Sequence, residues 1–108
     1  MMSGYRYMRT LVFFDLPTLT AAERKAAAGF RKALVKDGFL MLQESVYCKL
    51  SLNATAAEYV KERVKKYLPP SGSVILMLIT EKQFSNMDLC LGKRQSAIVD
   101  TDSKLVIL

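Results

Sequence analysis

The chain has 108 residues, enough for a single domain of ordinary size, and its 16 Lys and Arg against 10 Asp and Glu give a formal net charge of +6. It contains no histidine, which excludes a Ser-His-Asp triad, a histidine zinc site and an imidazole general base. Hydrophobic residues make up 51% and charged residues 24%, which is typical of a folded domain and excludes a disordered chain. A domain this small buries only about two thirds of its unfolded surface, so we expect it to oligomerise.

Cysteine usage and the longest apolar run indicate the cellular compartment. Cys48 and Cys90 stand in apolar surroundings without a C-x-x-C partner, which predicts two buried strand thiols and neither a disulfide nor a zinc site. The longest apolar run, residues 74–79, is far shorter than the ~20 residues of a membrane span. Asp15 and Pro17 interrupt the apolar stretch near the N-terminus, so it does not match a secretory signal. We expect a cytoplasmic protein without a membrane segment.

The first half of the chain predicts a strand, a helix and more strand. Residues 7–15 are rich in β-branched and aromatic side chains and end at a Leu-Pro turn, which predicts a buried strand. Thr20 and Glu23 have capping-box spacing, so a helix is expected over 20–36, ending at Asp37-Gly38. Residues 39–50 are again strand-like, but the polar segment 43–45 leaves two interpretations open: one long strand, or two short strands with a bend.

The second half repeats the pattern. Thr55 and Glu58 again have capping-box spacing, with Asn53 as a competing cap, and the helix is expected to end before Pro69-Pro70. Residues 73–80 are the most apolar run and predict a central strand buried on both faces. Residues 84–91 are weakly strand-like, residues 92–104 are typical of a surface loop, and the last four residues, 105–108, are all apolar.

This order of elements indicates an α+β fold. With two strands in 39–50, the chain has the β-α-β-β-α-β order of a ferredoxin-like antiparallel sheet with both helices on one face. A single middle strand would give an open α/β layer instead. We favour the first, as one domain over residues 1–108, with a tail over 85–108 that carries short strands.

The excess positive charge lies in the two predicted helices. The first helix has a net charge of +4, the second, taken as 55–68, has +2, and the rest of the chain is neutral. This distribution fits a phosphate-binding surface that attracts nucleic acid with little base specificity. It also fits an ordinary solvated helix exterior. The candidate nucleic-acid contacts are Arg24, Lys25, Arg31, Lys32, Lys36, Lys61, Arg63, Lys65 and Lys66.

Asp15 is the candidate metal ligand. It ends the first predicted strand, where the sheet would hold its carboxylate in an accessible position. It could equally brace the turn that follows, a role that Asp often has. Mg²⁺ seeks six oxygen ligands and usually takes one or two from carboxylates, so a second Asp15 from a two-fold mate would strengthen a metal site.

Several segments together resemble a known family. Strand one ends in Phe-Phe-Asp-Leu-Pro at 13–17, residues 43–47 read Gln-Glu-Ser-Val-Tyr, and residues 80–84 read Thr-Glu-Lys-Gln-Phe. With the basic helix between them, these segments resemble the CRISPR-associated protein two family, the small partner of the spacer-integration machinery. The C-terminal residues 104–108 look like those of members that accompany type II systems. Phe14 and Met41 stand where many members carry Tyr and a basic residue.

The resemblance implies a specific assembly and chemistry. It implies a homodimer in which the C-terminal strand of each subunit, Leu105, Val106, Ile107 and Leu108, adds to the sheet of the partner. It implies that the two copies of Asp15 face each other and hold Mg²⁺ or Mn²⁺ for endonuclease cleavage of RNA or DNA, with Ser45 and Tyr47 as candidate supports. It also implies that the dimer binds duplex DNA and bridges the subunits of the CRISPR-associated integrase.

A different class of function stays open at this point. A ferredoxin-like dimer could instead be a regulatory protein that binds a small effector. The sequence contains no glycine-rich phosphate loop that would favour it.

Overall fold

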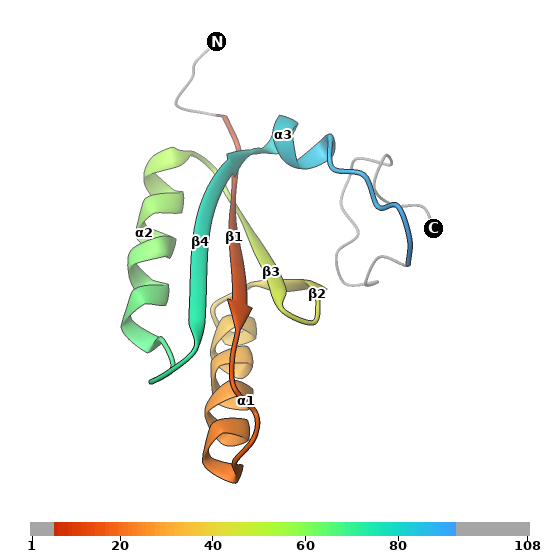
Figure 1. The fold of residues 1–108 in the computed structure, drawn as a ribbon. Coiled ribbons are helices and arrows are strands. Elements are labelled where there is room, and N and C mark those ends of the chain that lie inside the picture. The colour runs from red at the N-terminus through yellow and green to blue at the C-terminus, as the bar shows by residue number, and fades with distance from the viewer. Residues whose placement is uncertain (1–5, 93–108) are drawn as a thin grey trace.

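The computed structural model describes residues 6–92. The elements in chain order are β1 (Met8–Asp15), α1 (Ala21–Lys36), β2 (Leu40–Gln43), β3 (Val46–Ser51), α2 (Ala54–Val64), the 3-10 turn η2 (Lys65–Tyr67), β4 (Ser73–Thr80) and α3 (Glu81–Ser85). The strands form one antiparallel sheet in the order β2-β3-β1-β4 (Figure 1). This is the predicted ferredoxin-like arrangement, with two strands in 39–50 separated by the turn at Glu44-Ser45.

The two long helices begin at different kinds of cap. Thr20 forms the predicted capping box. Its hydroxyl accepts a hydrogen bond from the Glu23 backbone amide at 3.0 Å, and the Glu23 carboxylate accepts one from the Thr20 backbone amide at 3.0 Å. For α2 the prediction of a capping box at Thr55 is wrong. Asn53 is the cap instead, and its side chain accepts the Ala56 amide at 2.8 Å. The helix therefore starts earlier, and Thr55 lies inside its first turn.

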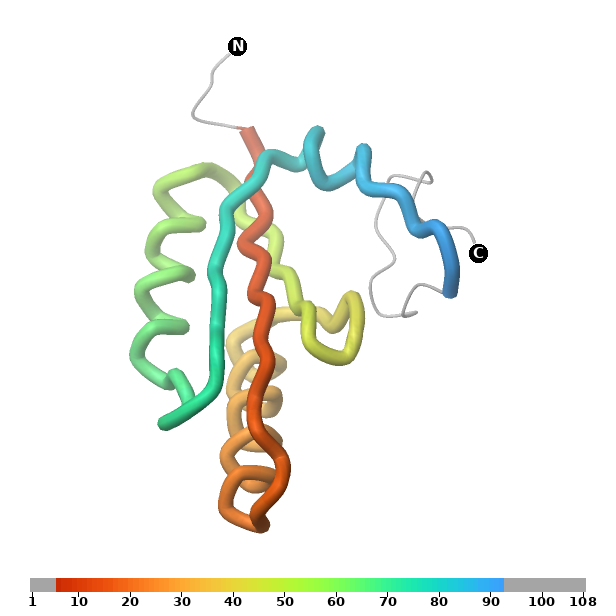
Figure 2. The backbone as a smooth tube through the Cα atoms, viewed as in Figure 1, coloured from red at the N-terminus to blue at the C-terminus, as the bar shows by residue number. Residues whose placement is uncertain are grey.

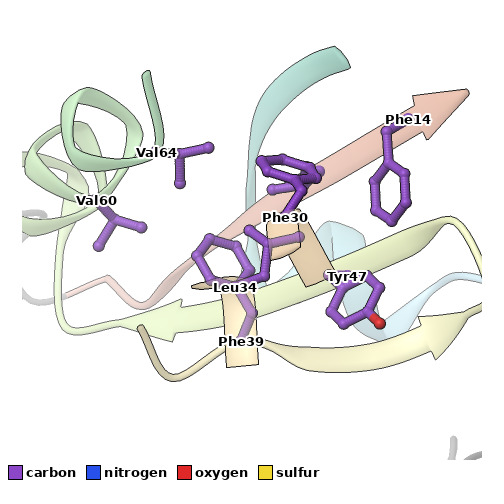
Figure 3. Packing of buried hydrophobic residues seen from close by; sticks show 8 residues of the cluster. Phe14, Phe30, Leu34, Phe39, Tyr47, Val60 and Val64 are labelled. Atoms are coloured by element: carbon purple, nitrogen blue, oxygen red, sulfur yellow. The ribbon is translucent and has the colours of Figure 1, made fainter. Parts of the chain in front are cut away.

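The main core lies between the sheet and α1 and α2. Figure 3 shows side chains from both helices meeting residues of β1 and β3, so both helices cover the same face of the sheet, as predicted. Strand alternation directs Val12 and Phe14 of β1 to this face. The buried cluster consists of Val12, Phe14, Phe30, Leu34, Phe39, Tyr47, Val60 and Val64.

The opposite face of the sheet is only partly covered. At one end, Phe84 of α3 packs on Leu11 and Cys48. Further along β4, Ile75 is 60% exposed and Met77 is 44% exposed. The prediction that residues 73–80 form a central strand buried on both faces is therefore wrong for this chain: β4 is an edge strand, and its burial alternates along the sequence.

The segment after β4 also differs from the prediction. Residues 81–85 form α3 because Thr80 and Gln83 make a capping box, so Phe84 lies in a helix and not in a strand. Residues 86–92 contain no strand, and Cys90 is exposed there, whereas Cys48 is buried in β3 as predicted. Figure 2 shows this segment running along the side of the molecule away from α2. The predicted tail strands beyond residue 92, including residues 105–108, lie outside the described residues.

No helix within residues 6–92 combines the length and the apolar character that crossing a membrane would require.

Candidate functional site

Asp15 is held at the end of β1 by backbone pairing on both sides. It lies opposite Ser73 of β4, and the preceding residue, Phe14, donates its amide to the Ser45 carbonyl at 3.0 Å. Because successive side chains of a strand point to opposite faces, Phe14 enters the helix-side core and Asp15 projects from the other face. The Asp15 side chain is exposed. The fold therefore presents this carboxylate to solvent on a backbone that is fixed from two directions.

The two residues predicted to support Asp15 lie in different places. Ser45 belongs to the turn between β2 and β3, and its carbonyl fastens the strand next to Asp15. Tyr47 is 3% exposed and its ring lies 5.6 Å from the ring of Phe14, inside the helix-side core. Burial raises the pKa of Tyr47, an effect that Arg31 opposes and Glu44 reinforces. Tyr47 is thus on the opposite face of the sheet from Asp15, and only Ser45 is brought to the end of β1.

The single carboxylate of Asp15 suits a hard divalent cation whose other coordination positions are filled by water and by phosphate oxygens. Within residues 6–92, no three Asp, Glu, Cys or His side chains are grouped closely enough to form a metal cage. One carboxylate oxygen donor is compatible with Mg²⁺ or Mn²⁺, which commonly take one or two carboxylates together with water and substrate oxygens. It does not suit a structural zinc site, which needs four nitrogen or sulfur ligands.

The basic residues of α2 and of the adjoining η2 are largely paired with acidic residues. Arg63 donates to Asp37 at 2.6 Å, Lys65 lies 2.9 Å from Glu62, and Lys61 lies 3.4 Å from Glu58. The hydrogen bond from Lys65 is the main cause of a lowered pKa at Glu62, and the hydrogen bond to Asp37 is the main cause of a raised pKa at Arg63. Of the four predicted contacts in this region, only Lys66 has no ion pair within the described part of the chain.

The basic residues of α1 fall into two groups. Arg24 donates to the Thr18 and Leu19 carbonyls at 3.1 Å, and Arg31 lies over the Phe14 ring at 5.3 Å from its centroid, so both are tied to the domain. The remaining three, which we call the α1 lysine stripe, are Lys25, Lys32 and Lys36. All three are exposed, and no ion pair links them to another residue between 6 and 92. Their spacing of seven and four residues puts them on one side of the helix.

Asp37 joins three elements in a way that the sequence alone does not reveal. Its carboxylate accepts hydrogen bonds from Arg63 at 2.6 Å and from the Tyr67 hydroxyl at 2.9 Å, and Lys49 lies 3.4 Å away. Burial raises the pKa of Asp37, but the hydrogen bonds from Arg63 and Tyr67 outweigh it and leave the pKa lowered. In the sequence, Asp37-Gly38 signalled only the end of a helix.

A second polar cluster holds α3 against the sheet. Arg9 of β1 is 4% exposed and pairs with both oxygens of Glu81, at 2.6 Å and 3.0 Å. Its guanidinium lies 4.2 Å from the centroid of the Phe84 ring. This cluster was not predicted from the sequence, although Thr80 and Gln83 have the capping-box spacing that would have located the helix.

The part of the chain that carries the sheet, the two long helices and Asp15 is similar in sequence to known proteins. The family described as "CRISPR associated protein Cas2" matches residues 8–87. The chain belongs to the Cas2 family. The match runs from the first residue of β1 to just beyond α3, so it contains the whole sheet, both long helices and Asp15. The resemblance seen in the sequence is confirmed.

Individual Cas2 relatives align over almost the whole chain. A protein of Treponema denticola is 43% identical over 94% of this chain and 100% of its own length. A protein of Streptococcus mutans is 46% identical over 94% of this chain and 93% of its own. A protein of Flavobacterium psychrophilum is 45% identical over 94% of this chain and 85% of its own. All three are named CRISPR-associated endoribonuclease Cas2.

Proposed function

We propose that this Cas2 chain is an endoribonuclease that cleaves phosphodiester bonds with a divalent cation held at Asp15. The observation that carries the proposal is the exposed Asp15 carboxylate, fixed between β4 and the Ser45 turn, in a chain whose relatives are named endoribonucleases. A bound Mg²⁺ or Mn²⁺ supplies polarisation of the phosphate and activation of water. Asp15 contributes the protein's oxygen ligand and sets where the phosphate is held.

Proton transfer in this proposal falls to water or to Asp15. The chain has no histidine, so an imidazole is excluded as the group that takes the proton from the attacking water. We therefore expect slow turnover at neutral pH and a rate that rises as the pH increases.

A homodimer completes the proposed site. The face of the sheet that carries Asp15 also carries the exposed apolar side chains Ile75 and Met77, with Phe13 and Ile79 partly buried beside them. A second copy packed on this face would cover these side chains and bring a second Asp15 toward the first. Within residues 6–92 no strand pairs with the outer edge of β4, so this edge can accept another strand, and the predicted partner is the C-terminal segment 105–108 of the other copy.

A second function is supported by the α1 lysine stripe. Lys25, Lys32 and Lys36 offer three positive charges on one side of a helix, where they can contact the backbone phosphates of duplex DNA. We propose that this surface holds duplex DNA during spacer acquisition, when the dimer bridges subunits of the CRISPR-associated integrase. The protein would then act in the cytoplasm as both a nuclease and an adaptor.

The nuclease proposal is tested by Asp15→Asn, with Asp88→Asn as the matched control. Asp88 is also exposed, so it undergoes the same change from carboxylate to amide away from β1. Removal of a metal ligand is expected to lower the rate of cleavage of a single-stranded RNA by at least about 100-fold, whereas the control retains it. The assay is run with Mg²⁺, with Mn²⁺ and with a chelator. An Asp15→Asn protein that cleaves RNA as fast as the wild type would contradict the proposal.

A further inference from the structure

The turn before β4 lies directly against the end of β1. Asp15 pairs with Ser73, the first residue of β4, so Gly72 sits beside the backbone that carries the Asp15 carboxylate. Leu16 and Pro17, which follow Asp15, line a small apolar cavity together with Pro69, Pro70 and residues of α1. The position of Asp15 is thus set partly by how closely this turn approaches it.

Gly72 is the point of closest approach. Its φ is +100°, a conformation that residues with a side chain rarely adopt. A Cβ atom at Gly72 would lie 2.9 Å from the Asp15 carbonyl oxygen, 2.8 Å from Leu16 Cδ2 and 3.0 Å from Pro17 Cδ. The carbonyl oxygen and the proline ring cannot rotate away, so any side chain at 72 must displace the end of β1 or the turn.

The other left-handed glycines do not have this neighbourhood. A Cβ at Gly38, with φ +101°, would approach only the flexible end of Lys49, at 2.9 Å from Nζ. A Cβ at Gly92, with φ +108°, would meet nothing within 4 Å. Gly72 therefore differs from them by its approach to Asp15 and the two residues that follow, and not by its backbone conformation.

We propose that Gly72 is a positioning residue for Asp15: the absence of a side chain at 72 fixes the end of β1 so that the carboxylate can hold the cation in the right place. This inference rests on the proposed role of Asp15. A shift of even about 1 Å at a positioning element can cost as much as 100-fold in rate, so a small displacement here is expected to matter.

The test compares Gly72→Ala with Gly92→Ala in the full chain. Both variants place alanine in a left-handed conformation, but only the first adds an atom against Asp15. Two quantities are measured: the backbone amide chemical shifts of Asp15 and Leu16 by NMR, and the affinity for Mn²⁺ alone by electron paramagnetic resonance. Gly72→Ala is expected to move both amide signals and to weaken Mn²⁺ binding by at least about 10-fold, while Gly92→Ala changes neither.

A second variant covers the case in which Gly72→Ala does not fold. Asparagine tolerates a positive φ better than alanine, so Gly72→Asn adds the same Cβ with less backbone strain. Two results with a folded variant at position 72 would overturn the inference. One is that the amide signals of Asp15 and Leu16 stay where they are in Gly92→Ala. The other is that the variant binds Mn²⁺ with the affinity of the wild type. Asp15→Asn separates the proposed metal role of Asp15 from the proposed positioning role of Gly72. If Asp15→Asn binds Mn²⁺ like the wild type, the metal role of Asp15 fails. The amide signals of Asp15 and Leu16 then decide alone whether Gly72 positions the end of β1.

Discussion

Among single residues, Asp37 and Asp15 show how the same side chain serves opposite purposes. The Asp37 side chain is 11% exposed and accepts hydrogen bonds from Arg63 and Tyr67, which fixes the end of α1 to α2 and η2. Burial and the bond to Asp37 also raise the pKa of Tyr67, so the tyrosine keeps its proton and remains a donor. Asp15 has no comparable cage among the described residues and stays exposed. The first is a structural carboxylate, and the second is available to a ligand.

The stabilising role of Asp37 predicts a pH dependence. Its pKa is lowered in the folded protein, so its contribution to the free energy of unfolding is present above the ordinary value of about 3.9 and disappears as the pH falls through the folded value. Asp37→Asn should lower the free energy of unfolding by about 1–2 kcal/mol at neutral pH. The effect is small because the Arg63 side chain is half exposed and solvent screens its interaction with Asp37.

Urea denaturation at pH 7 and near pH 3 measures this effect. The difference between wild type and Asp37→Asn should shrink at the lower pH, because the Asp37 carboxylate of the unfolded chain takes up a proton below its ordinary pKa, while the folded one does so only at a lower pH. Asp88→Asn, an exposed carboxylate outside this cluster, should match the wild type at both values. Equal stability of Asp37→Asn and wild type at pH 7 would show that these hydrogen bonds do not stabilise the fold.

Among the elements, the two long helices share a basic composition but differ in how much of their charge is available. Net positive charge was predicted for both helices. In α2 and η2, however, three of the four basic residues form ion pairs with Asp37, Glu58 and Glu62. Asp37 and Arg63 are 26 residues apart in the chain, so their pairing depends on the folded arrangement. In the described part of the chain, the α1 lysine stripe is a surface on which three exposed lysines on one side of a helix have no ion pair.

This difference predicts which helix binds duplex DNA. Lys25→Ala with Lys32→Ala should reduce the slope of log affinity against log salt by about 1.8, because each neutralised phosphate contributes about 0.9 to that slope. Lys61→Ala with Lys65→Ala makes the same change in charge at lysines already paired with glutamates, and it should leave the slope nearly unchanged. Fluorescence anisotropy between low and physiological salt gives both slopes. Equal reductions in the two double variants would contradict a binding surface centred on α1.

For the molecule as a whole, the two faces of the sheet differ in how well they are covered. The helix-side face is closed by α1 and α2, whereas the other face is covered by α3 at one end and leaves Ile75 and Met77 exposed. Burying these half-exposed side chains from two copies would contribute roughly 1 kcal/mol for each side chain, or about 4 kcal/mol for a dimer. The exposed apolar face and Asp15 belong to the same side of the sheet, so the proposed dimer and the proposed catalysis would be linked.

The dimer is tested by Ile75→Glu, with Tyr59→Glu on α2 as the control. Tyr59 is 68% exposed and Ile75 is 60% exposed, so both variants add one charge at an apolar surface position. Ile75→Glu should halve the mass measured by light scattering, because the interface would bury a glutamate from each copy without a partner charge, and Tyr59→Glu should not. An Ile75→Glu protein with the mass of the wild type would place the interface elsewhere. Truncation after Lys104 then asks separately whether the C-terminal segment is required.

Elements whose signals are local could be predicted from the amino-acid order. The capping box at Thr20, the glycine after Asp37, and the apolar strand ending in Asp15 depend on neighbours within a few residues, and the structure places them as predicted. The family was also visible in short segments, such as the strand that ends in Asp15 and the 80–84 motif, because each can be read without knowing the fold.

Which faces are covered depends on the folded arrangement. Residues 73–80 are almost continuously apolar, which in sequence is typical of a strand buried on both sides, but here β4 is an edge strand with one face open. Likewise, the placement of Tyr47 away from Asp15, the neutralisation of Arg63 by Asp37 and the approach of Gly72 to Asp15 join residues distant in the chain. Such pairings follow from sheet order and helix packing, which bring these residues together only after folding.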